Sequence, residues 1–371
     1  MRKFVLFELS LCITLLALLG FSQPAQASQN LQNDDPVERG RYLANIAGCT
    51  SCHTPDGAEY QNPQSLTLEQ IQVIAFDGNK ALNNEKFMAG GRAFDLGPAG
   101  VVFSRNITQD AETGIGTWTD EQIKLAIKTG VSADGSILFP VMPYHVYNGM
   151  ADSDIDAIVA FLRTVPAVNN QVPESTVNKD GLAALPYQQG IQAPDASDPA
   201  AHGAYLVNHI MGCTDCHTPV DPNTGAPQMD KYLAGRQPYE GPWGIVYGGN
   251  ITPDEETGIG IWTNEEIKRS IVSGIGRDGR RLILMPWYAY STLTAEDADA
   301  VAYFLKNDLP AVQNEIPAPS LNPDFMVTAP EETGSKSSGF DFTSPVVLVV
   351  VAIVIMAAVT LGMFILRRKN G

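Results

Sequence analysis

Two matching stretches decide how this chain folds: Gly48-Cys49-Thr50-Ser51-Cys52-His53-Thr54-Pro55 and Gly212-Cys213-Thr214-Asp215-Cys216-His217-Thr218-Pro219. They differ at one position, where Ser51 stands opposite Asp215. Other segments recur in the same order around them: Gly-x-Tyr-Leu at 40–43 and 203–206, Asn-Ile-Thr at 106–108 and 250–252, and Met-Pro-aromatic at 142–144 and 285–287. A repeat of this kind indicates two copies of one structural unit.

The two copies are not equal in length. Their cysteines are 164 residues apart, whereas their Asn-Ile-Thr segments are 144 residues apart. The first copy therefore carries 20 extra residues between these points, roughly at 60–87. We predict a first domain at 36–168, a connector rich in Pro, Asn and Gln at 169–197, and a second domain at 198–312.

Helix signals fall at matching places in both copies. Asp35-Pro36 and Asp198-Pro199 are typical of a helix start, where an N-cap acid precedes a proline. Capping boxes and C-terminal glycines follow in each copy: Thr119 with Gln122 and Gly130, then Thr263 with Glu266 and Gly274. Apolar residues after Asp152 and Thr294 repeat at helical spacing. Strand patterns are scarce, so we expect an all-α fold with two helical domains in tandem.

The Cys-x-x-Cys-His motif suits covalent haem attachment. Each thiol can add to one haem vinyl group, and the adjacent histidine can reach the iron. We therefore predict two covalently bound haem c groups, held by Cys49, Cys52 and His53 in the first copy and by Cys213, Cys216 and His217 in the second. Three alternatives use the same cysteines: a structural zinc site, which usually takes four Cys or His ligands, a redox-active dithiol and a short structural disulfide.

A sixth iron ligand is needed if the iron is to pass electrons rather than bind a substrate. Met142 and Met285 are the predicted ligands, because they occupy the same position in the repeat and each precedes a proline. His145 lies three residues after Met142 and is an alternative ligand. Trp118 and Trp262 follow matching Thr-Gly-Ile-Gly turns. Each either packs in the core or donates its indole N–H to a haem propionate.

Both ends of the chain are apolar. Residues 1–27 combine two basic residues, an apolar run and a small-x-small exit, which predicts a secretory signal peptide. Residues 346–366 carry no charge and could cross a bilayer, which takes about 20 residues, and the basic tail at 367–371 predicts a cytoplasmic end. We expect a single-pass protein of the cytoplasmic membrane, with haem domains on the periplasmic or extracellular side and a flexible stalk at 313–345.

The predicted exported part is strongly acidic. Residues 28–345 hold 19 basic and 40 acidic residues, a net charge of −21. Such a surface repels nucleic acid, and it favours protein partners that present a basic docking surface. Residues 28–197 carry −10 and residues 198–345 carry −11. We therefore expect the two domains to be joined by the connector and apolar contacts rather than by net attraction.

These motifs resemble those of tandem class I c-type cytochromes. More narrowly, the chain is similar to the cytochrome c subunits of membrane-bound alcohol, aldehyde and gluconate dehydrogenase complexes. The resemblance rests on the two Cys-x-x-Cys-His motifs, the Asn-Ile-Thr to Thr-Gly-Ile-Gly segments and the Met-Pro-aromatic segments. It implies two helical haem domains that relay electrons from a dehydrogenase to quinone or a terminal carrier. Those subunits usually carry three haem motifs, and this chain has two.

The sequence thus predicts an electron carrier rather than an enzyme. We expect a membrane-anchored dihaem c-type cytochrome that takes electrons from a dehydrogenase and passes them to a cytochrome or oxidase of a respiratory chain. The alternative is a dihaem redox enzyme, peroxidase-like or thiosulfate-oxidising, with one displaceable axial ligand. A haem-based sensor is a further alternative, although only five residues follow the predicted membrane helix.

Overall fold

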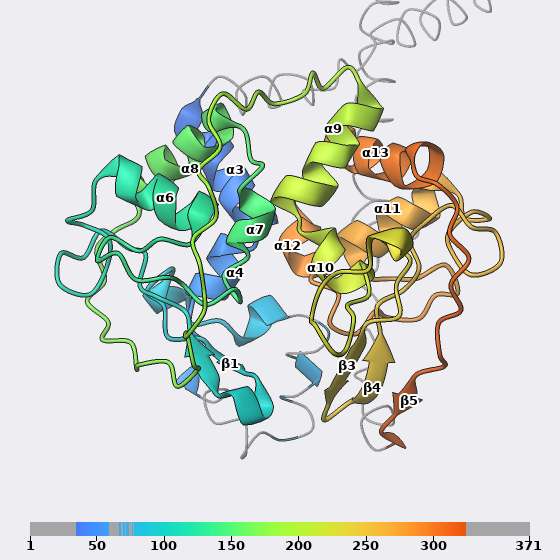
Figure 1. Ribbon diagram of the computed structural model, residues 1–371, viewed down its shortest axis with the longest axis horizontal. Helices are drawn as coiled ribbons and strands as arrows, with labels where there is room; N and C mark the ends of the chain where they lie inside the picture. The colour runs from blue at the N-terminus through green and yellow to red at the C-terminus, as the bar shows by residue number, and fades with distance from the viewer. Residues whose placement is uncertain are drawn as a thin grey trace, which may run out of the picture. The chain divides into compact units, whose positions relative to one another are not determined.

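The computed structural model describes residues 35–58, 67, 70, 72–73, 76 and 78–323 (Figure 1). All of them fall in the first of the chain's two units, which is Met1–Thr328; the second unit is Ala329–Gly371. Several predicted segments lie outside the described residues: the signal peptide at 1–27, the transmembrane helix at 346–366, the tail at 367–371 and most of the stalk at 313–345.

Helices of the two copies follow one another in the same order. The first copy contains α3 (Pro36–Ile46), α4 (Cys49–His53), α6 (Asp120–Thr129), α7 (Tyr144–Tyr147) and α8 (Asp152–Thr164). The second contains α9 (Pro199–Tyr205) with its continuation η7 (Leu206–Ile210), α10 (Cys213–His217), α11 (Asn264–Ser273), α12 (Trp287–Tyr290) and α13 (Ala295–Tyr303) with η9 (Phe304–Asp308). Short 3-10 turns lie at η4 (Gly78–Ala81), η5 (Asn84–Lys86), η6 (Gly97–Ala99) and η8 (Met229–Lys231).

The predicted helix caps are confirmed. Thr119 and Thr263 each close a capping box on the third helical residue of α6 and α11. Gly130 and Gly274 end these helices in the left-handed conformation, with φ values of 77° and 65°. Asp35 accepts a hydrogen bond from the Val37 N–H at the start of α3. These caps satisfy terminal backbone groups that a helix cannot pair internally.

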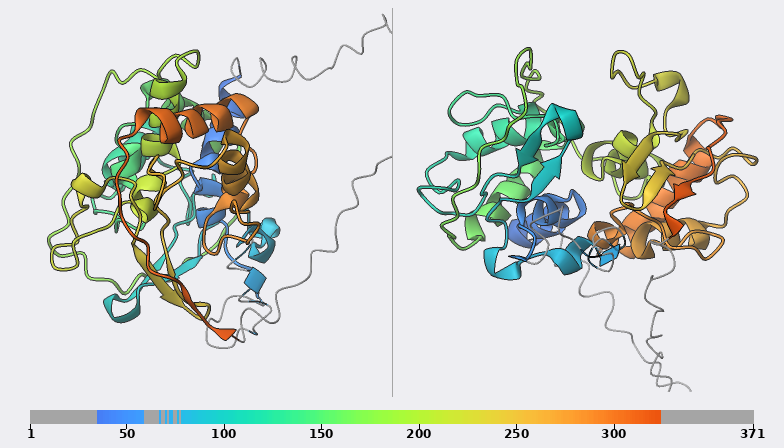
Figure 2. Two further views of the ribbon diagram at one scale, coloured as in Figure 1. Left: turned by 90° about the vertical axis from the view of Figure 1, so that its right-hand side faces the viewer. Right: turned by 90° about the horizontal axis from the view of Figure 1, so that it is seen from below.

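The all-α prediction is wrong, because two small antiparallel sheets accompany the helices. One pairs β1 (Ala93–Asp95) with β2 (Val101–Phe103), and the other joins β3 (Pro238–Gly241), β4 (Gly244–Tyr247) and β5 (Ser320–Leu321). Figure 2 shows the three-stranded sheet in yellow and orange. Each hairpin lies between the helix of a Cys-x-x-Cys-His motif, α4 or α10, and an Asn-Ile-Thr segment. Runs of two to four residues are too short to show the alternation that identifies a strand in a sequence.

The predicted membrane span is also corrected. Among the described residues, which have gaps between 58 and 78, no helix is long and apolar enough to cross a bilayer. The helix α8, for example, has 13 residues, whereas a span takes about 20. The predicted C-terminal transmembrane helix and single-pass membrane localisation therefore have no counterpart in the described fold.

Helices at the start and end of each copy pack against each other at close range. In Figure 1, α3 lies beside α8 and α9 lies beside α13. Two glycines permit this approach: a Cβ on Gly40 would lie 1.8 Å from the carbonyl oxygen of Ala157, and one on Gly203 would lie 2.1 Å from that of Ala300. These glycines occupy matching positions, so the first and last helices of both copies pack closely in the same way.

Reciprocal polar contacts join the two domains. The Tyr205 hydroxyl donates to Asp154 at 2.7 Å, and the Tyr42 hydroxyl donates to Asp297 in the same way from the other domain. Tyr42 matches Tyr205 in the repeat, and Asp154 matches Asp297. Exchanging the two copies therefore converts one bond into the other. All four side chains are buried. The interface therefore contains specific buried hydrogen bonds, which the sequence analysis did not predict.

Each interface carboxylate is also bonded within its own domain. The guanidinium of Arg39 donates to Asp154 at 3.1 Å, and the imidazole of His202 lies 2.6 Å from Asp297. Arg39 and His202 occupy matching positions in the repeat. Each half of the interface is thus a three-residue cluster, with a different basic partner in each copy.

Candidate functional site

The two Cys-x-x-Cys-His motifs form single-turn helices, α4 and α10. Gly48 and Gly212 precede them in the left-handed conformation, with φ values of 78° and 63°. In a helix, residues at i, i+3 and i+4 lie on neighbouring positions of one face. Both cysteines and the histidine of each motif therefore share one face. All four cysteines are free thiols, so the predicted alternative of a short disulfide is not formed.

Both motif histidines are oriented by a backbone carbonyl. The His53 Nδ1 lies 2.7 Å from the carbonyl oxygen of Arg105, and the His217 Nδ1 lies 2.7 Å from that of Gly249. With the proton on Nδ1, the Nε2 lone pair is left for a metal, and such a second bond commonly fixes the ring of a ligating histidine. Burial lowers the pKa of both histidines, which favours the neutral imidazole that binds iron.

A loop after each motif helix returns to the histidine. The Gly90 N–H donates to the His53 carbonyl oxygen at 2.7 Å, and the Gly235 N–H donates to that of His217 at 2.6 Å. Gly90 and Gly235 both have positive φ values, 71° and 75°, and a Cβ on either would meet backbone atoms within 2.6 Å. The loops of both copies therefore contact the motif histidines through the same backbone hydrogen bond.

The thiols do not have the properties of a redox-active dithiol. Burial raises the pKa of Cys49 to about 12 and that of Cys213 to about 12. Burial also raises the pKa of Cys52 and Cys216. A redox-active Cys-x-x-Cys pair requires the opposite shift, because the thiolate is the nucleophile. Protonated thiols beside a neutral histidine, with three of the cysteines half-buried and Cys216 exposed, fit a covalently attached haem better than a reactive dithiol.

The predicted methionine ligands lie on equivalent loops. Met142 and Met285 are half-buried and pack against the apolar core, as do Cys49 and Cys213. The carbonyl oxygen of each methionine accepts a hydrogen bond at 2.8 Å from the backbone N–H two residues later. Each loop therefore has the same local geometry and places its methionine against the core that also contacts the attachment motif. Iron ligation by these residues stays a prediction.

The alternative ligand His145 has another partner. Its Nε2 lies 2.9 Å from the Asp215 carboxylate, which belongs to the attachment helix of the other domain. This bond raises the pKa of His145. At the matching positions the sequence has Tyr288 and Ser51, which cannot form an ion pair. Sequence reasoning missed this contact, although the single difference between the two motifs, Asp215, marks its position.

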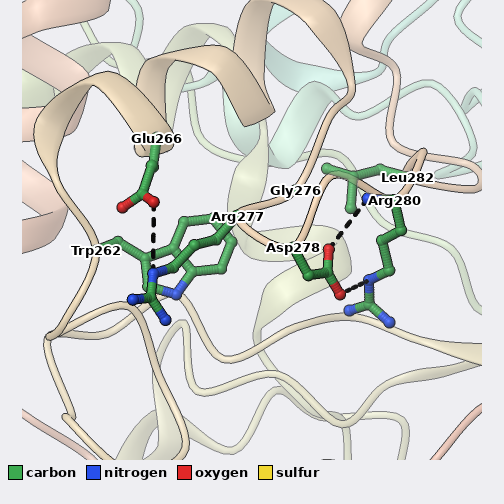
Figure 3. Close-up of a pocket in the computed structure, with 7 residues that line it drawn as sticks. All are labelled: Trp262, Glu266, Gly276, Arg277, Asp278, Arg280 and Leu282. Atoms are coloured by element: carbon green, nitrogen blue, oxygen red, sulfur yellow. Dashed lines mark hydrogen bonds and ion pairs between the residues drawn. The ribbon is translucent and has the colours of Figure 1, made fainter.

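A cavity of about 360 Å³ lies beside Trp262 (Figure 3). Its lining contains two ion pairs, Arg277 with Glu266 at 3.5 Å and Arg280 with Asp278 at 3.4 Å. Ala133 and Ser136 stand opposite these arginines in the first copy. The two domains therefore differ in charge beside the tryptophans that were predicted either to pack in the core or to face a haem propionate.

Two buried tyrosines lie near both attachment motifs. The Tyr147 hydroxyl donates to the Ala47 carbonyl oxygen at 2.6 Å, and the Tyr290 hydroxyl donates to the Met211 carbonyl oxygen at 2.8 Å. Burial raises the pKa of both tyrosines well above the ordinary value, and cysteines of the motifs, including Cys52 near Tyr290, raise it further. The two motifs therefore approach each other at the domain interface.

Comparison with known proteins defines the class of the first domain. Residues 37–166 match the family model of cytochrome c.

Relatives extend the likeness to most of the chain. The cytochrome subunit of fructose dehydrogenase from Gluconobacter japonicus is 29% identical over 74% of this chain and 53% of its own length. The cytochrome c subunit of the quinone alcohol dehydrogenase from Gluconobacter oxydans is 29% identical over 80% of this chain and 60% of its own length. A dihaem cytochrome c-type protein from Cereibacter sphaeroides is 26% identical over 75% of this chain and 87% of its own length.

The predicted resemblance to cytochrome c subunits of dehydrogenases is confirmed by these relatives. They are cytochrome subunits, which agrees with the prediction of an electron carrier rather than an enzyme. The chain spans 53% and 60% of the length of these two dehydrogenase subunits.

Proposed function

We propose that this protein is a dihaem c-type cytochrome that carries electrons. One observation supports this most directly: both motif histidines are held through Nδ1 by a backbone carbonyl at 2.7 Å, at equivalent places in the two copies. The domains at 36–168 and 198–312 would each hold one haem c. The residues that hold them are Cys49, Cys52, His53 and Met142 in the first domain, and Cys213, Cys216, His217 and Met285 in the second.

Haem c, when bound, supplies a one-electron iron couple. The remaining features are contributed by the protein. The cysteines would keep the group attached, and the half-buried, neutral histidines would each give one nitrogen ligand. The methionines would give a soft, uncharged second ligand, which raises the reduction potential. Two protein ligands would leave no position for a substrate, and this separates a carrier from the dihaem enzyme alternative.

The domain interface supports a relay within one chain. The attachment helix α10 contacts the first domain through Asp215 and His145. The Tyr147 and Tyr290 side chains lie near both motifs. The reciprocal Tyr–Asp bonds connect the domains through buried groups. The separation between the two proposed redox centres would therefore be set by a specific interface rather than by the connector alone.

We propose that the electron donor is a dehydrogenase, because relatives of this chain are dehydrogenase subunits. The acceptor would be a cytochrome or oxidase of a respiratory chain. Both parts of the sequence from 28 to 345 are acidic, with net charges of −10 up to residue 197 and −11 beyond it. A soluble partner should therefore dock through lysines and arginines, and its association should slow as salt screens the attraction.

Redox titration of the holoprotein tests this function. The expected result is two one-electron transitions with low-spin spectra in both oxidation states. The double variants Cys49→Ser/Cys52→Ser and Cys213→Ser/Cys216→Ser should each lose one transition and keep the other. A high-spin haem that turns over peroxide in the unmodified protein would instead support the enzyme alternative.

A further inference from the structure

Phe76 of the first domain contacts the methionine loop of the second. It lies in the region, roughly 60–87, that holds the extra residues of the first copy. The indole N–H of Trp287 donates to the Phe76 carbonyl oxygen at 2.6 Å, across 211 positions of the sequence. The Phe76 side chain is 7% exposed, so it is buried in this contact region. A residue of one domain is therefore bonded two positions from the predicted iron ligand of the other.

A second contact holds Phe76 from the other side of Met285. The guanidinium of Arg281 lies 5.3 Å from the centre of the Phe76 ring, within the range of a cation–π interaction. Arg281 precedes Met285 by four residues and Trp287 follows it by two. The segment 281–287 thus contacts Phe76 near both of its ends, with Met285 between them.

The segment 281–287 also contains a strained residue. Leu284, directly before Met285, has a φ of 64°. This left-handed conformation is unfavourable for a side chain other than glycine, and it persists where surrounding contacts determine the backbone. The two contacts with Phe76 supply such a constraint next to the strained position.

The first copy cannot reproduce this arrangement. Ile137 matches Arg281 and has no cation, and Tyr144 matches Trp287 and has no ring N–H. Stacking on the following ring is common to both copies, with ring centres 6.3 Å apart at Tyr144 and 6.2 Å apart at Trp287. The contact with Phe76 therefore distinguishes the methionine loop of the second domain from that of the first.

We infer that Phe76 is a positioning residue for Met285, the sixth iron ligand of the second domain. The inference rests on the proposed function, since it takes Met285 to bind iron. Because Phe76 contacts both ends of the segment 281–287, it holds the strained backbone in place. It thereby keeps the Met285 thioether packed against the core. The first domain thereby tunes how often the methionine of the second domain leaves the iron.

Imidazole binding to the oxidised holoprotein measures that opening, because an external ligand binds after the methionine leaves. Trp287→Phe removes the N–H and keeps the ring, and Phe76→Leu removes the cation–π contact. Each should speed imidazole binding at one haem by about fivefold, the size expected for one lost hydrogen bond or comparable contact. Each should also lower the potential of that haem while leaving the other unchanged.

Matched variants serve as controls. Tyr144→Phe at the equivalent position of the first domain, and Phe76→Tyr, which keeps an aromatic ring over Arg281, should leave both imidazole rates unaltered. A melting measurement on each variant shows that the domains remain folded. Unchanged imidazole binding and potentials in both Trp287→Phe and Phe76→Leu would overturn the positioning role.

Met285→Ala separates this inference from the proposed function. If Met285 binds iron, this variant loses half of the methionine-to-iron charge-transfer band, and imidazole binds one haem without a preceding slow step. If the variant leaves that band unaltered, the ligand assignment itself fails. If the band halves but Trp287→Phe and Phe76→Leu have no effect, only the role of Phe76 fails.

Discussion

The two domains share the residues proposed to hold a haem and differ in the residues around them. Helix caps, the histidine–carbonyl bonds at 2.7 Å and the tyrosine hydroxyls that reach backbone carbonyls recur in both. The differences lie at the interface and beside the site, where one copy has Arg39, His145 and Ser136, and the other has His202, Tyr288 and Arg280. This pattern indicates that the two similar candidate haem sites have electrostatically different surroundings.

The interface carboxylates offer the largest contrast between the domains. Asp154→Ala leaves the guanidinium of Arg39, which is always charged, without its partner in a mostly buried site. We expect a loss of about 3 kcal/mol in the free energy of unfolding. Asp297→Ala removes the bonds to His202 and Tyr42, and neither partner need then be a buried charge. We expect a smaller loss of about 2 kcal/mol in the free energy of unfolding.

Denaturant titration of both variants checks this order. Equal losses, or a larger loss for Asp297→Ala, would show that the basic partners of the two carboxylates do not matter. The slope of the transition should stay the same, because neither substitution changes the surface exposed on unfolding.

The close helix contacts should behave alike in both domains. Gly40→Ala and Gly203→Ala each place a Cβ within about 2 Å of a backbone carbonyl oxygen of the facing helix. Overpacking of this kind outweighs the better helix propensity of alanine, and we expect a net loss of about 2 kcal/mol for each variant. Thermal unfolding measures it, and a variant as stable as the unmodified protein would contradict the observed packing distance.

Acid should weaken the interface at Asp297. Burial alone would raise the pKa of this carboxyl, but hydrogen bonds from His202 and Tyr42 outweigh it and hold the pKa below the ordinary value. A carboxyl with a lowered folded pKa adds stability above its unfolded pKa, about 3.9, and loses it as the pH falls through the folded value. The free energy of unfolding should therefore decline below about pH 4, and Asp297→Asn should show a smaller decline. An equal decline in the variant would assign the effect to other carboxyls.

The His145–Asp215 contact should give the smallest effect and the opposite pH dependence. The hydrogen bond to Asp215 raises the pKa of His145, so its contribution is complete below the unfolded value of about 6.5 and disappears as the pH rises through the folded one. Both side chains are nearly half exposed, and we expect His145→Gln to cost about 0.5 kcal/mol at pH 6 and nothing at pH 9. Tyr288→Gln, at the matching position, should give a difference that does not vary between these values.

The sequence predicts the elements whose signals are local. The capping residues Thr119 and Thr263 and the C-cap glycines all follow from neighbouring residues, and the repeat doubles each signal. The strands were missed because β2 has three residues and β5 has two.

Contacts across the domains were missed for a different reason. Tyr42 and Asp297 are 255 positions apart, and Phe76 and Trp287 are 211 apart, so no local pattern connects them. A partial signal was present: Tyr42 and Tyr205 recur within Gly-x-Tyr-Leu, and an acid recurs at 154 and 297 on a helix whose neighbouring positions are apolar. Polar residues repeated on an apolar face indicate a buried bond, but not its partner.

Intact-mass measurement of the holoprotein under denaturing conditions tests the central claim most directly, because only covalently attached groups survive unfolding. The account predicts a chain that carries two haem groups, falling to one in Cys49→Ser/Cys52→Ser and to one in Cys213→Ser/Cys216→Ser. A chain without haem, or one that carries a single haem in the unmodified protein, would contradict it.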